Sequence, residues 1–386
     1  PPRSTLFPYT TLFRSSAKMH NKIKDGKSIN NNGFDYLFAP TKPIFKRHDV
    51  TIANMEFPVV HPFDSRAFNF NCEPEIIPAM LQSGINMVTV ANNHTYDKGV
   101  NGLIETLERL ENAGMKYIGA GITEERARKG LIVAKDGIQI GLLGYTGVFN
   151  IRLNKADSQK PRVNDFNDEQ KVIEDIKRLK KNVDFLIINV HWGTEYTTLP
   201  REKERRLAQL YADAGADLII GHHPHVLQYV ERFNTKDGRS CLVVYSLGNF
   251  ISNQAYYYTP AHPVHKGRER DSVILSLEIA KKPRAGLYPD EQGRSTVFLK
   301  SATFIPIWTI NRRVRINNRN VIQIRTYPIY RLIEKINLQI QNNTGSSQLL
   351  KSEKKMLQKR LEDIQRVLFL KGKPDNVIFE EPGTQL

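Results

Sequence analysis

The sequence contains few cysteines and no long apolar segment, and both shortages exclude classes of protein. Only Cys72 and Cys241 occur among 386 residues, too few for a disulfide framework or a cysteine-rich zinc site. The two cysteines form either one disulfide bridge or two buried free thiols. Their number therefore does not indicate whether the protein is in an oxidising or a reducing compartment. No apolar run reaches the roughly 18 residues that a membrane helix requires. With 40% hydrophobic and 25% charged residues, the composition is globular and excludes a long disordered chain.

Acidic residues are outnumbered by basic ones. The chain has 56 Lys and Arg against 40 Asp and Glu, which gives a net charge of +16. A basic surface favours polyanionic partners such as nucleic acid, anionic lipid or an acidic polymer. The alternative, weighted about equally, is a general surface charge together with a basic tail.

The first 15 residues differ from the rest of the chain. Residues 1–15 repeat the triplet Thr-Leu-Phe, begin without Met and contain no signal-peptide pattern. They resemble translated sequencing-adapter DNA. We therefore expect residues 1–15 to be an artefact that makes few contacts with the core. A native segment with an export signal, a lipid anchor or a first strand is expected to have stood in their place.

Short apolar runs alternate with helical patterns between residues 30 and 280, which predicts an α/β layered domain. The expected strands are 51–55, 85–90, 138–143, 184–190, 217–220 and 242–245. The expected helices are 74–82, 100–112, 168–181 and 201–213. Residues 281–386 are expected to form a C-terminal extension with strands at 296–305 and 321–327 and a basic amphipathic helix near 347–370. That helix either packs as an ordinary helix or binds a membrane surface or a partner.

Histidines are concentrated directly after expected strands. The five in such positions are His94, His191, His222, His223 and His225. Loops at the carboxyl ends of strands converge on one crevice in an open α/β sheet. A single histidine at a strand end is more often structural, but the joint pattern favours a shared site. With Glu56 and Asn93, the set offers imidazole, carboxylate and amide ligands, which suit Mn, Fe or Zn. One or two such ions would generate hydroxide and hold a phosphoryl or related oxygen.

Four ordered blocks of sequence are similar to the CapA-type capsule synthesis proteins, also called poly-γ-glutamate synthesis proteins. The blocks are 91–99, 191–196, 213–228 and 245–250, and the third is the most specific. The resemblance covers about residues 30–280. It implies a branch of the calcineurin-like metallophosphoesterases, with a four-layer αββα sandwich and a two-metal site between its sheets.

The resemblance also implies metal ligands. Asn93, His191 and His223 match ligands of the second metal. His225 matches a ligand of the first metal, and Glu56 matches a bridging carboxylate that is usually an aspartate. The family's first strand ends in Gly-Asp, and no such segment precedes Glu56. The first metal site is therefore expected to be incomplete, and weak metal binding without activity is left open beside a metal-dependent hydrolase.

Further residues are assigned to catalysis and substrate binding. His94 matches the histidine that protonates the leaving group or steadies the transition state. Asp97 either orients that imidazole or caps the following helix. His222 and Asn249 are expected to contact substrate.

Two functions remain open at this point. The first is a metal-dependent hydrolase in capsule or poly-γ-glutamate synthesis or export, acting on a phosphoester or an anionic polymer. The alternative is a non-catalytic component that binds metal or polymer in an envelope polymer-synthesis assembly. The resemblance implies an extracytoplasmic location at the cell envelope and a membrane-bound polymer-synthesis complex as partner. No specific nucleic acid is expected.

Overall fold

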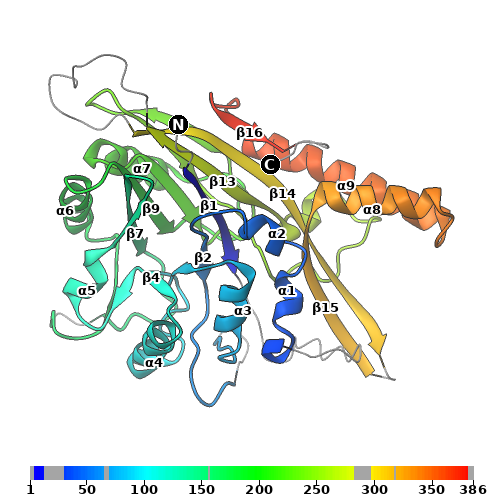
Figure 1. The fold of residues 1–386 in the computed structure, drawn as a ribbon, viewed down its shortest axis with the longest axis horizontal. Helices are drawn as coiled ribbons and strands as arrows, with labels where there is room; N and C mark the ends of the chain where they lie inside the picture. Colours follow the sequence, from blue (N-terminus) through cyan, green and yellow to red (C-terminus); the bar gives the residue numbers. More distant parts are fainter. Residues whose placement is uncertain are drawn as a thin grey trace.

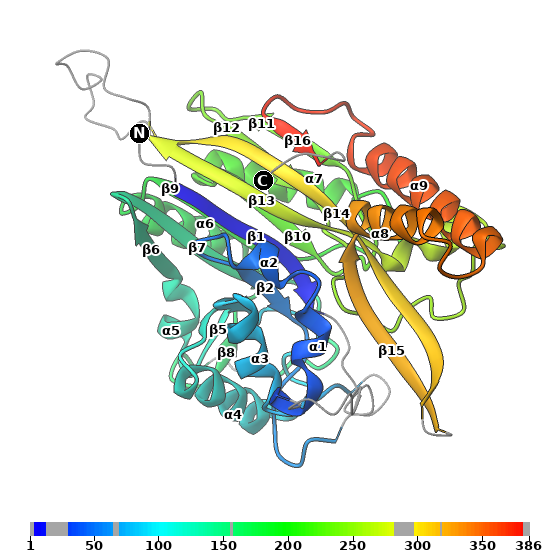
Figure 2. The ribbon, with the colours of Figure 1, turned by 45° about the vertical axis from the view of Figure 1, so that its right-hand side comes forward.

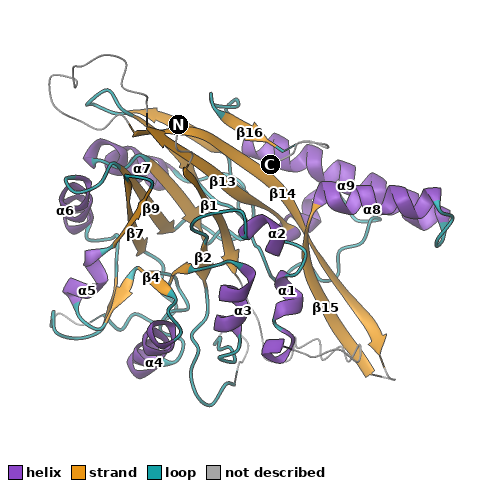
Figure 3. Ribbon diagram, in the orientation of Figure 1, coloured by secondary structure: helices purple, strands orange, loops and turns teal. Residues whose placement is uncertain are grey.

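Two β-sheets face each other, and helices cover the outer face of each (Figures 1 and 3). The computed structural model describes residues 4–12, 30–64, 69–154, 157–281, 297–316 and 319–380. None of the helices in these ranges is long and apolar enough to cross a membrane.

The first sheet has eight strands in the order β15-β14-β13-β1-β2-β3-β4, with β16 beside β14. Strands β1 to β4 run parallel, whereas β13, β14 and β15 pair antiparallel with their neighbours. The bounds are β1 (Ser4–Leu12), β2 (Ile52–Met55), β3 (Met87–Thr89), β4 (Lys116–Ile118), β13 (Asp271–Lys281), β14 (Val297–Ile316), β15 (Arg319–Pro328) and β16 (Val377–Phe379).

The second sheet has six strands in the order β11-β12-β10-β9-β7-β6. Strands β7, β9, β10 and β12 are parallel, so their carboxyl ends share one edge of the sheet. The bounds are β6 (Leu131–Lys135), β7 (Ile138–Thr146), β9 (Phe185–His191), β10 (Leu218–His222), β11 (Val230–Asn234) and β12 (Ser240–Val244). A separate two-stranded sheet joins β5 (Ala120–Gly121) and β8 (Arg162–Val163).

Helices pack on both outer faces and beside the first sheet. Those whose buried residues share a core with β2 and β3 are α1 (Asp35–Phe38), α2 (Lys42–Phe45), α3 (Ile76–Ser83) and α4 (Gly99–Asn112). Those that pack on β7, β9 and β10 are α6 (Glu169–Lys180) and α7 (Glu202–Ala214). The others are α5 (Glu124–Lys129), α8 (Ile329–Gln341), α9 (Ser347–Leu368) and the 3-10 helices η2 (Asn30–Gly33) and η3 (Val264–Arg270).

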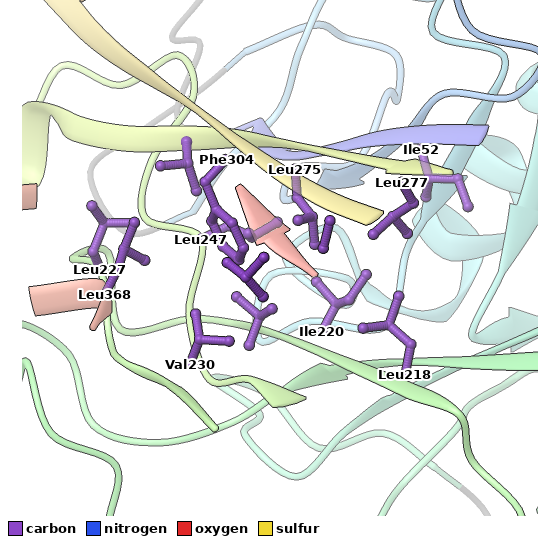
Figure 4. Packing of buried hydrophobic residues seen from close by; sticks show 14 of the residues in the cluster. Ile52, Leu218, Ile220, Leu227, Val230, Leu247, Leu275, Leu277, Phe304 and Leu368 are labelled. Atoms are coloured by element: carbon purple, nitrogen blue, oxygen red, sulfur yellow. The ribbon is translucent and has the colours of Figure 1, made fainter. Parts of the chain in front are cut away.

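Strand β10 begins with three consecutive apolar residues, Leu218 to Ile220, because both faces of the strand are buried there. Successive side chains of a strand point to opposite faces, so a strand buried on both faces needs an apolar residue at every position. Leu218 and Ile220 lie in the core between the sheets, together with Leu275 of β13 (Figure 4). Ile219 lies in the core under α6 and α7. The α/β class and the four-layer αββα sandwich that we predicted are therefore confirmed.

The C-terminal extension is built onto the same core. The first part of β14, Val297 to Trp308, pairs with the whole of β13, from Lys281 back to Asp271. Helix α9 contributes Leu357, Ile364 and Leu368 to the core between the sheets (Figure 4 shows Leu368). The expected basic amphipathic helix is therefore present, and its apolar face packs against the first domain.

Truncating one core residue of α9 tests this packing. We expect Leu357→Ala to lower the free energy of unfolding by about 2–5 kcal/mol, because Leu357 is fully buried between the sheets. The matched control is Leu349→Ala on the same helix. Leu349 is 67% exposed, so its loss should change stability by no more than about 0.5 kcal/mol. Urea unfolding monitored by circular dichroism measures both, and equal losses would contradict a packed α9.

The expectation that residues 1–15 make few contacts with the core is wrong for the part that the structure describes. Strand β1 lies inside the first sheet, antiparallel to β13 and parallel to β2 (Figure 2). The register with β13 shifts between Leu6 and Pro8, where proline cannot donate a ladder hydrogen bond. Residues 1–3 and 13–15 lie outside the described residues. The adapter origin of this stretch stays a prediction.

Candidate metal centre

The polar residues singled out in the sequence follow strands of both sheets. Glu56 directly follows β2, and Asn93 and His94 follow β3 in the first sheet. His191 is the last residue of β9, and His223 directly follows β10, in the second sheet. Because these strands are parallel within each sheet, their carboxyl ends bring the five side chains to the junction of the sheets.

One group of side chains gathers ligand atoms from both sheets. One ligand atom each from Glu56, His191 and His223 lies within 4.8 Å of the others. The amide oxygen of Asn93 lies 3.0 Å from Nε2 of His191. The predicted convergence of Asn93, His191 and His223 is confirmed, and we call these three residues with Glu56 the inner group. Their binding of a metal stays a prediction.

The chemistry of the inner group fits a divalent ion. His191 and His223 are 1% and 6% exposed, and Nδ1 of each has no hydrogen-bond partner among the described residues. Burial lowers the pKa of His191 well below its usual range and that of His223 to about 4. Both rings are therefore neutral at pH 7, the form that binds a metal. Two imidazoles, a carboxylate and an amide oxygen suit Mn, Fe or Zn.

Asn93 is oriented by its neighbour across the site. Nδ2 of Asn93 donates to Oδ1 of Asn150 at 3.1 Å. The backbone oxygen of Asn93 accepts from the backbone N–H of Asn150 at 3.2 Å. The Asn93 amide oxygen consequently faces His191. Asn150 follows β7, and its role was missed in the sequence. The same search for polar residues after strands, extended from histidine to amide side chains, would have found it.

Of the two groups of ligand atoms found among the described residues, Glu56 belongs to the inner one. Its Oε2 accepts a hydrogen bond from Nδ2 of Asn54 at 3.1 Å, and its Oε1 is 3.8 Å from Nε2 of His191. A second group of ligand atoms within 4.8 Å contains Glu195, His223 and His225 without Glu56. Whether Glu56 binds one ion or bridges two stays a prediction.

His94 and Asp97 form a buried pair beside the inner group. Nδ1 of His94 lies 2.7 Å from Oδ2 of Asp97, which also accepts the backbone N–H of Phe70 at 2.6 Å. The His94 ring stacks on Phe70 with centroids 3.9 Å apart. Helix α4 has Lys98 as its N-cap, with no side-chain capping bond. Of the two roles considered for Asp97, the structure thus shows orientation of His94 rather than helix capping.

His225 and Asn249 lie on the other side of His223. The Asn249 amide oxygen is 3.1 Å from Nδ1 of His225, and its nitrogen donates to the backbone oxygens of His225 and Glu269. Asn249 is fully buried, so this geometry favours a positioning role over the expected substrate contact. His222, also assigned to substrate, is 2% exposed at the end of β10, and burial lowers its pKa to about 3.

Comparison with known proteins places the chain among capsule synthesis proteins. The model of the family described as bacterial capsule synthesis protein PGA_cap matches residues 14–254. The PGA biosynthesis protein CapA of Bacillus subtilis (strain 168) is 31% identical over 260 residues, which cover 66% of this chain and 64% of that protein. The capsule biosynthesis protein CapA of Bacillus anthracis is 30% identical over 260 residues, 65% of this chain and 62% of that protein. The chain thus spans less than two thirds of the length of each relative.

Solved structures show weaker likenesses. The NAD nucleotidase of Haemophilus influenzae aligns with a TM-score of 0.47 at 12% identity, covering 99% of this chain and 65% of that one. The 5'-nucleotidase of Candida albicans SC5314 aligns with a TM-score of 0.40 at 14% identity, covering 77% and 50%. Because both scores are low, the four-layer description rests on the sheets and cores of this chain.

Proposed function

The chain belongs to the bacterial capsule synthesis protein family, and we propose that it is a metal-dependent hydrolase of an anionic substrate. The observation that carries the proposal is the meeting of Asn93, His191 and His223 from two sheets. Two buried imidazole nitrogens there have no hydrogen-bond partner among the described residues. Buried polar atoms are nearly always paired, so these nitrogens indicate a ligand-binding role.

The residues of the inner group would bind the ion, and His94 would donate a proton to the leaving group. A divalent ion bound by the inner group would lower the pKa of a bound water and polarise an oxygen of the substrate. Asp97 accepts from Nδ1 of His94, so Nε2, which lies 3.4 Å from Nδ2 of Asn150, would be the atom that exchanges a proton with the leaving group. The Asp97 carboxylate stabilises the imidazolium form, and the stack on Phe70 fixes the plane of the ring.

The substrate class follows from charge and family. A net charge of +16 favours an anionic substrate, either a phosphoester or an anionic polymer. The names of the two Bacillus relatives refer to capsule and PGA biosynthesis, which supports a polymer. We further propose an extracytoplasmic location at the cell envelope and a membrane-bound polymer-synthesis assembly as partner. We propose no specific nucleic-acid partner.

A non-catalytic role is the second candidate, and one observation favours it. Strand β1 lies parallel to β2 in the first sheet, but Phe13, Arg14 and Ser15 follow it in the sequence. None of these residues carries a carboxylate. A centre with fewer carboxylate ligands would hold metal or polymer without fast turnover.

Metal-dependent turnover separates the candidates. The purified chain, with Mn²⁺ added after chelator treatment, would be tested on bis(p-nitrophenyl) phosphate and on poly-γ-glutamate. We expect hydrolysis of at least one substrate, its loss in EDTA and its return with Mn²⁺. His191→Ala is the control for traces of contaminating hydrolase. Metal binding without turnover of either substrate would favour the non-catalytic role, and absence of metal binding would contradict the hydrolase and leave polymer binding as the non-catalytic role.

A further inference from the structure

A broad groove lies at the edge of the second sheet opposite the candidate metal centre. Its volume is about 1110 Å³, and it is lined by Phe185 at the start of β9, Asp217 just before β10 and Ser240 at the start of β12. The candidate metal ligands lie at the carboxyl ends of β9 and β10. The length of β9, about 20 Å at about 3.3 Å per residue, therefore separates the groove from the metal centre.

The lining of this groove is basic. Five cationic side chains line it against three carboxylates, which leaves an excess of two positive charges. The cations are Lys177, Lys180, Lys181, Arg232 and Arg239. A concave surface with an excess of one sign of charge raises the local concentration of ions of the opposite sign. The groove therefore favours an anionic ligand.

The three carboxylates are already engaged within the protein. Asp217 is 9% exposed and accepts from Nζ of Lys180 at 2.6 Å and from Nη1 of Arg239 at 3.1 Å. Asp237 accepts from Nε of Arg239 at 2.8 Å, and Asp184 accepts a backbone N–H at 2.8 Å. These bonds fix the walls of the groove and satisfy two of its five cations.

The other three cations, Lys177, Lys181 and Arg232, have no ion pair with a residue in the part of the chain that the structure describes. The hydrogen bonds of Arg232 are to neutral oxygens, among them Oγ of Ser240 at 2.9 Å and Oδ1 of Asn376 at 2.6 Å. Burial lowers the pKa of Arg232, which reflects the cost of removing its charge from water. An anion in the groove would offset that cost.

The arrangement of these cations suits a long ligand. Lys177 and Lys181 lie one turn apart at the carboxyl end of α6, so they share one face. Cations there also stabilise the helix dipole, but Arg232 lies on β11 and has no such role. The volume of the groove exceeds the roughly 300–1,000 Å³ of small-ligand pockets, so it can hold several units of a polymer.

Apolar side chains in the lining favour a carboxylate polymer over a nucleic acid. They include Val183 and Phe298, of which Phe298 is 38% exposed. In an acidic polypeptide, methylene groups stand between one carboxylate and the next, and these can contact apolar surface while the carboxylates meet Lys and Arg. A nucleic acid carries a phosphate at every nucleotide and requires a denser array of cations.

We infer that this groove, which we call the basic groove, binds an acidic polymer through its carboxylates at a distance from the metal centre. The inference deepens the proposed function and rests on it for the polymer as substrate. A polymer bound in the basic groove keeps its other segments close to the metal centre and so raises their effective concentration there. The basic groove thus retains a long substrate on the protein.

Binding of fluorescein-labelled poly-γ-glutamate, measured by fluorescence anisotropy in EDTA, tests the basic groove apart from the metal centre. The double variant Lys177→Gln/Lys181→Gln should bind about 3–30-fold more weakly than the wild type, the loss expected for two exposed ion pairs. The matched control is Lys351→Gln/Lys355→Gln on α9, because both lysines are exposed and lie outside the groove. Its affinity should stay within about twofold of wild type, since distant charges are screened.

The outcomes distinguish the basic groove from the proposed function. Equal weakening in the two double variants would reflect net charge alone and overturn the groove. Tighter binding of a single-stranded oligodeoxynucleotide than of poly-γ-glutamate would overturn the carboxylate polymer as its occupant.

Turnover of bis(p-nitrophenyl) phosphate without polymer binding would overturn the groove and leave the hydrolase intact. Polymer binding that is weakened only in the groove variant, in a wild type without turnover, would support the groove and contradict the hydrolase. Both double variants should melt at the wild-type temperature, which shows that a lower affinity does not reflect lost folding.

Discussion

Substituting His223 by alanine should remove bound metal and turnover together. His223 is the one residue that belongs to both groups of ligand atoms, with Glu56 and His191 on one side and Glu195 and His225 on the other. Burial lowers the pKa of His223 and keeps its ring neutral at pH 7, and its Nδ1 has no hydrogen-bond partner in the part of the chain that the structure describes, so it is free to bind a metal. We expect metal content to fall from the wild-type value to near zero and turnover to become undetectable.

Metal analysis by mass spectrometry, run beside a thermal unfolding curve, measures this effect. His265→Ala is the matched control, because His265 is an exposed histidine of η3 outside both groups. It should keep wild-type metal content. If His223 were only a packed core residue, its substitution would lower the melting temperature and leave the metal content unchanged. Equal metal content in wild type and His223→Ala would thus refute its role as a ligand.

Substituting His94 by alanine should reduce turnover about 10²–10⁴-fold and leave the metal in place. A positioned general acid contributes a factor of this size without holding the ion. His94 is outside both groups of ligand atoms, and its Nδ1 is engaged by Asp97 at 2.7 Å. The reduction should appear mainly in kcat, since the substrate still meets the metal.

Asp97→Asn separates orientation from proton transfer. The amide keeps the shape of the carboxylate but no longer stabilises a positive imidazole, so we expect a smaller fall in kcat with unchanged metal content. His94→Ala with unchanged kcat would contradict the role of His94 as acid. His94→Ala with metal lost in proportion to turnover would instead make it a ligand.

Most of the layered fold could be predicted because its strands are buried on both faces. Runs such as Leu218-Ile219-Ile220 show this in the sequence alone, and all six strands and four helices expected between residues 30 and 280 overlap observed ones. Cys72 and Cys241 lie in different cores, which excludes a bridge between them and leaves the alternative of buried thiols.

The place of β1 could not be read from its own residues. Its neighbours are β13, more than 250 residues later in the chain, and β2, about 40 residues later, so the pairing is non-local. The strand has nine residues, with a register shift at Pro8, and the pattern of its own residues does not indicate which distant strands it pairs with. The sequence argument about the origin of residues 1–15 was therefore a poor guide to their structure.

The inner group was predictable for a different reason than the second group of ligand atoms, Glu195, His223 and His225. Side chains after parallel strands of one sheet meet at one edge, so His191 and His223 could be placed together from their strands. The expectation that one sheet carries the whole set is wrong, because Asn93 follows β3 of the other sheet and reaches His191 only where the two sheets face each other. Glu195 lies in a loop, and its approach to His225 depends on hydrogen bonds between two loops. It stands in the block 191–196 that resembled the family, and a search for carboxylates near those histidines would have drawn attention to it.

Anomalous X-ray diffraction from a crystal of the full chain soaked in Mn²⁺ tests the central claim most directly. The account predicts a strong anomalous peak within bonding distance of Asn93 Oδ1, His191 and His223, about 2.0–2.2 Å from its ligand atoms. The absence of a peak between these residues, in a crystal where Mn²⁺ binds elsewhere on the chain, would contradict it.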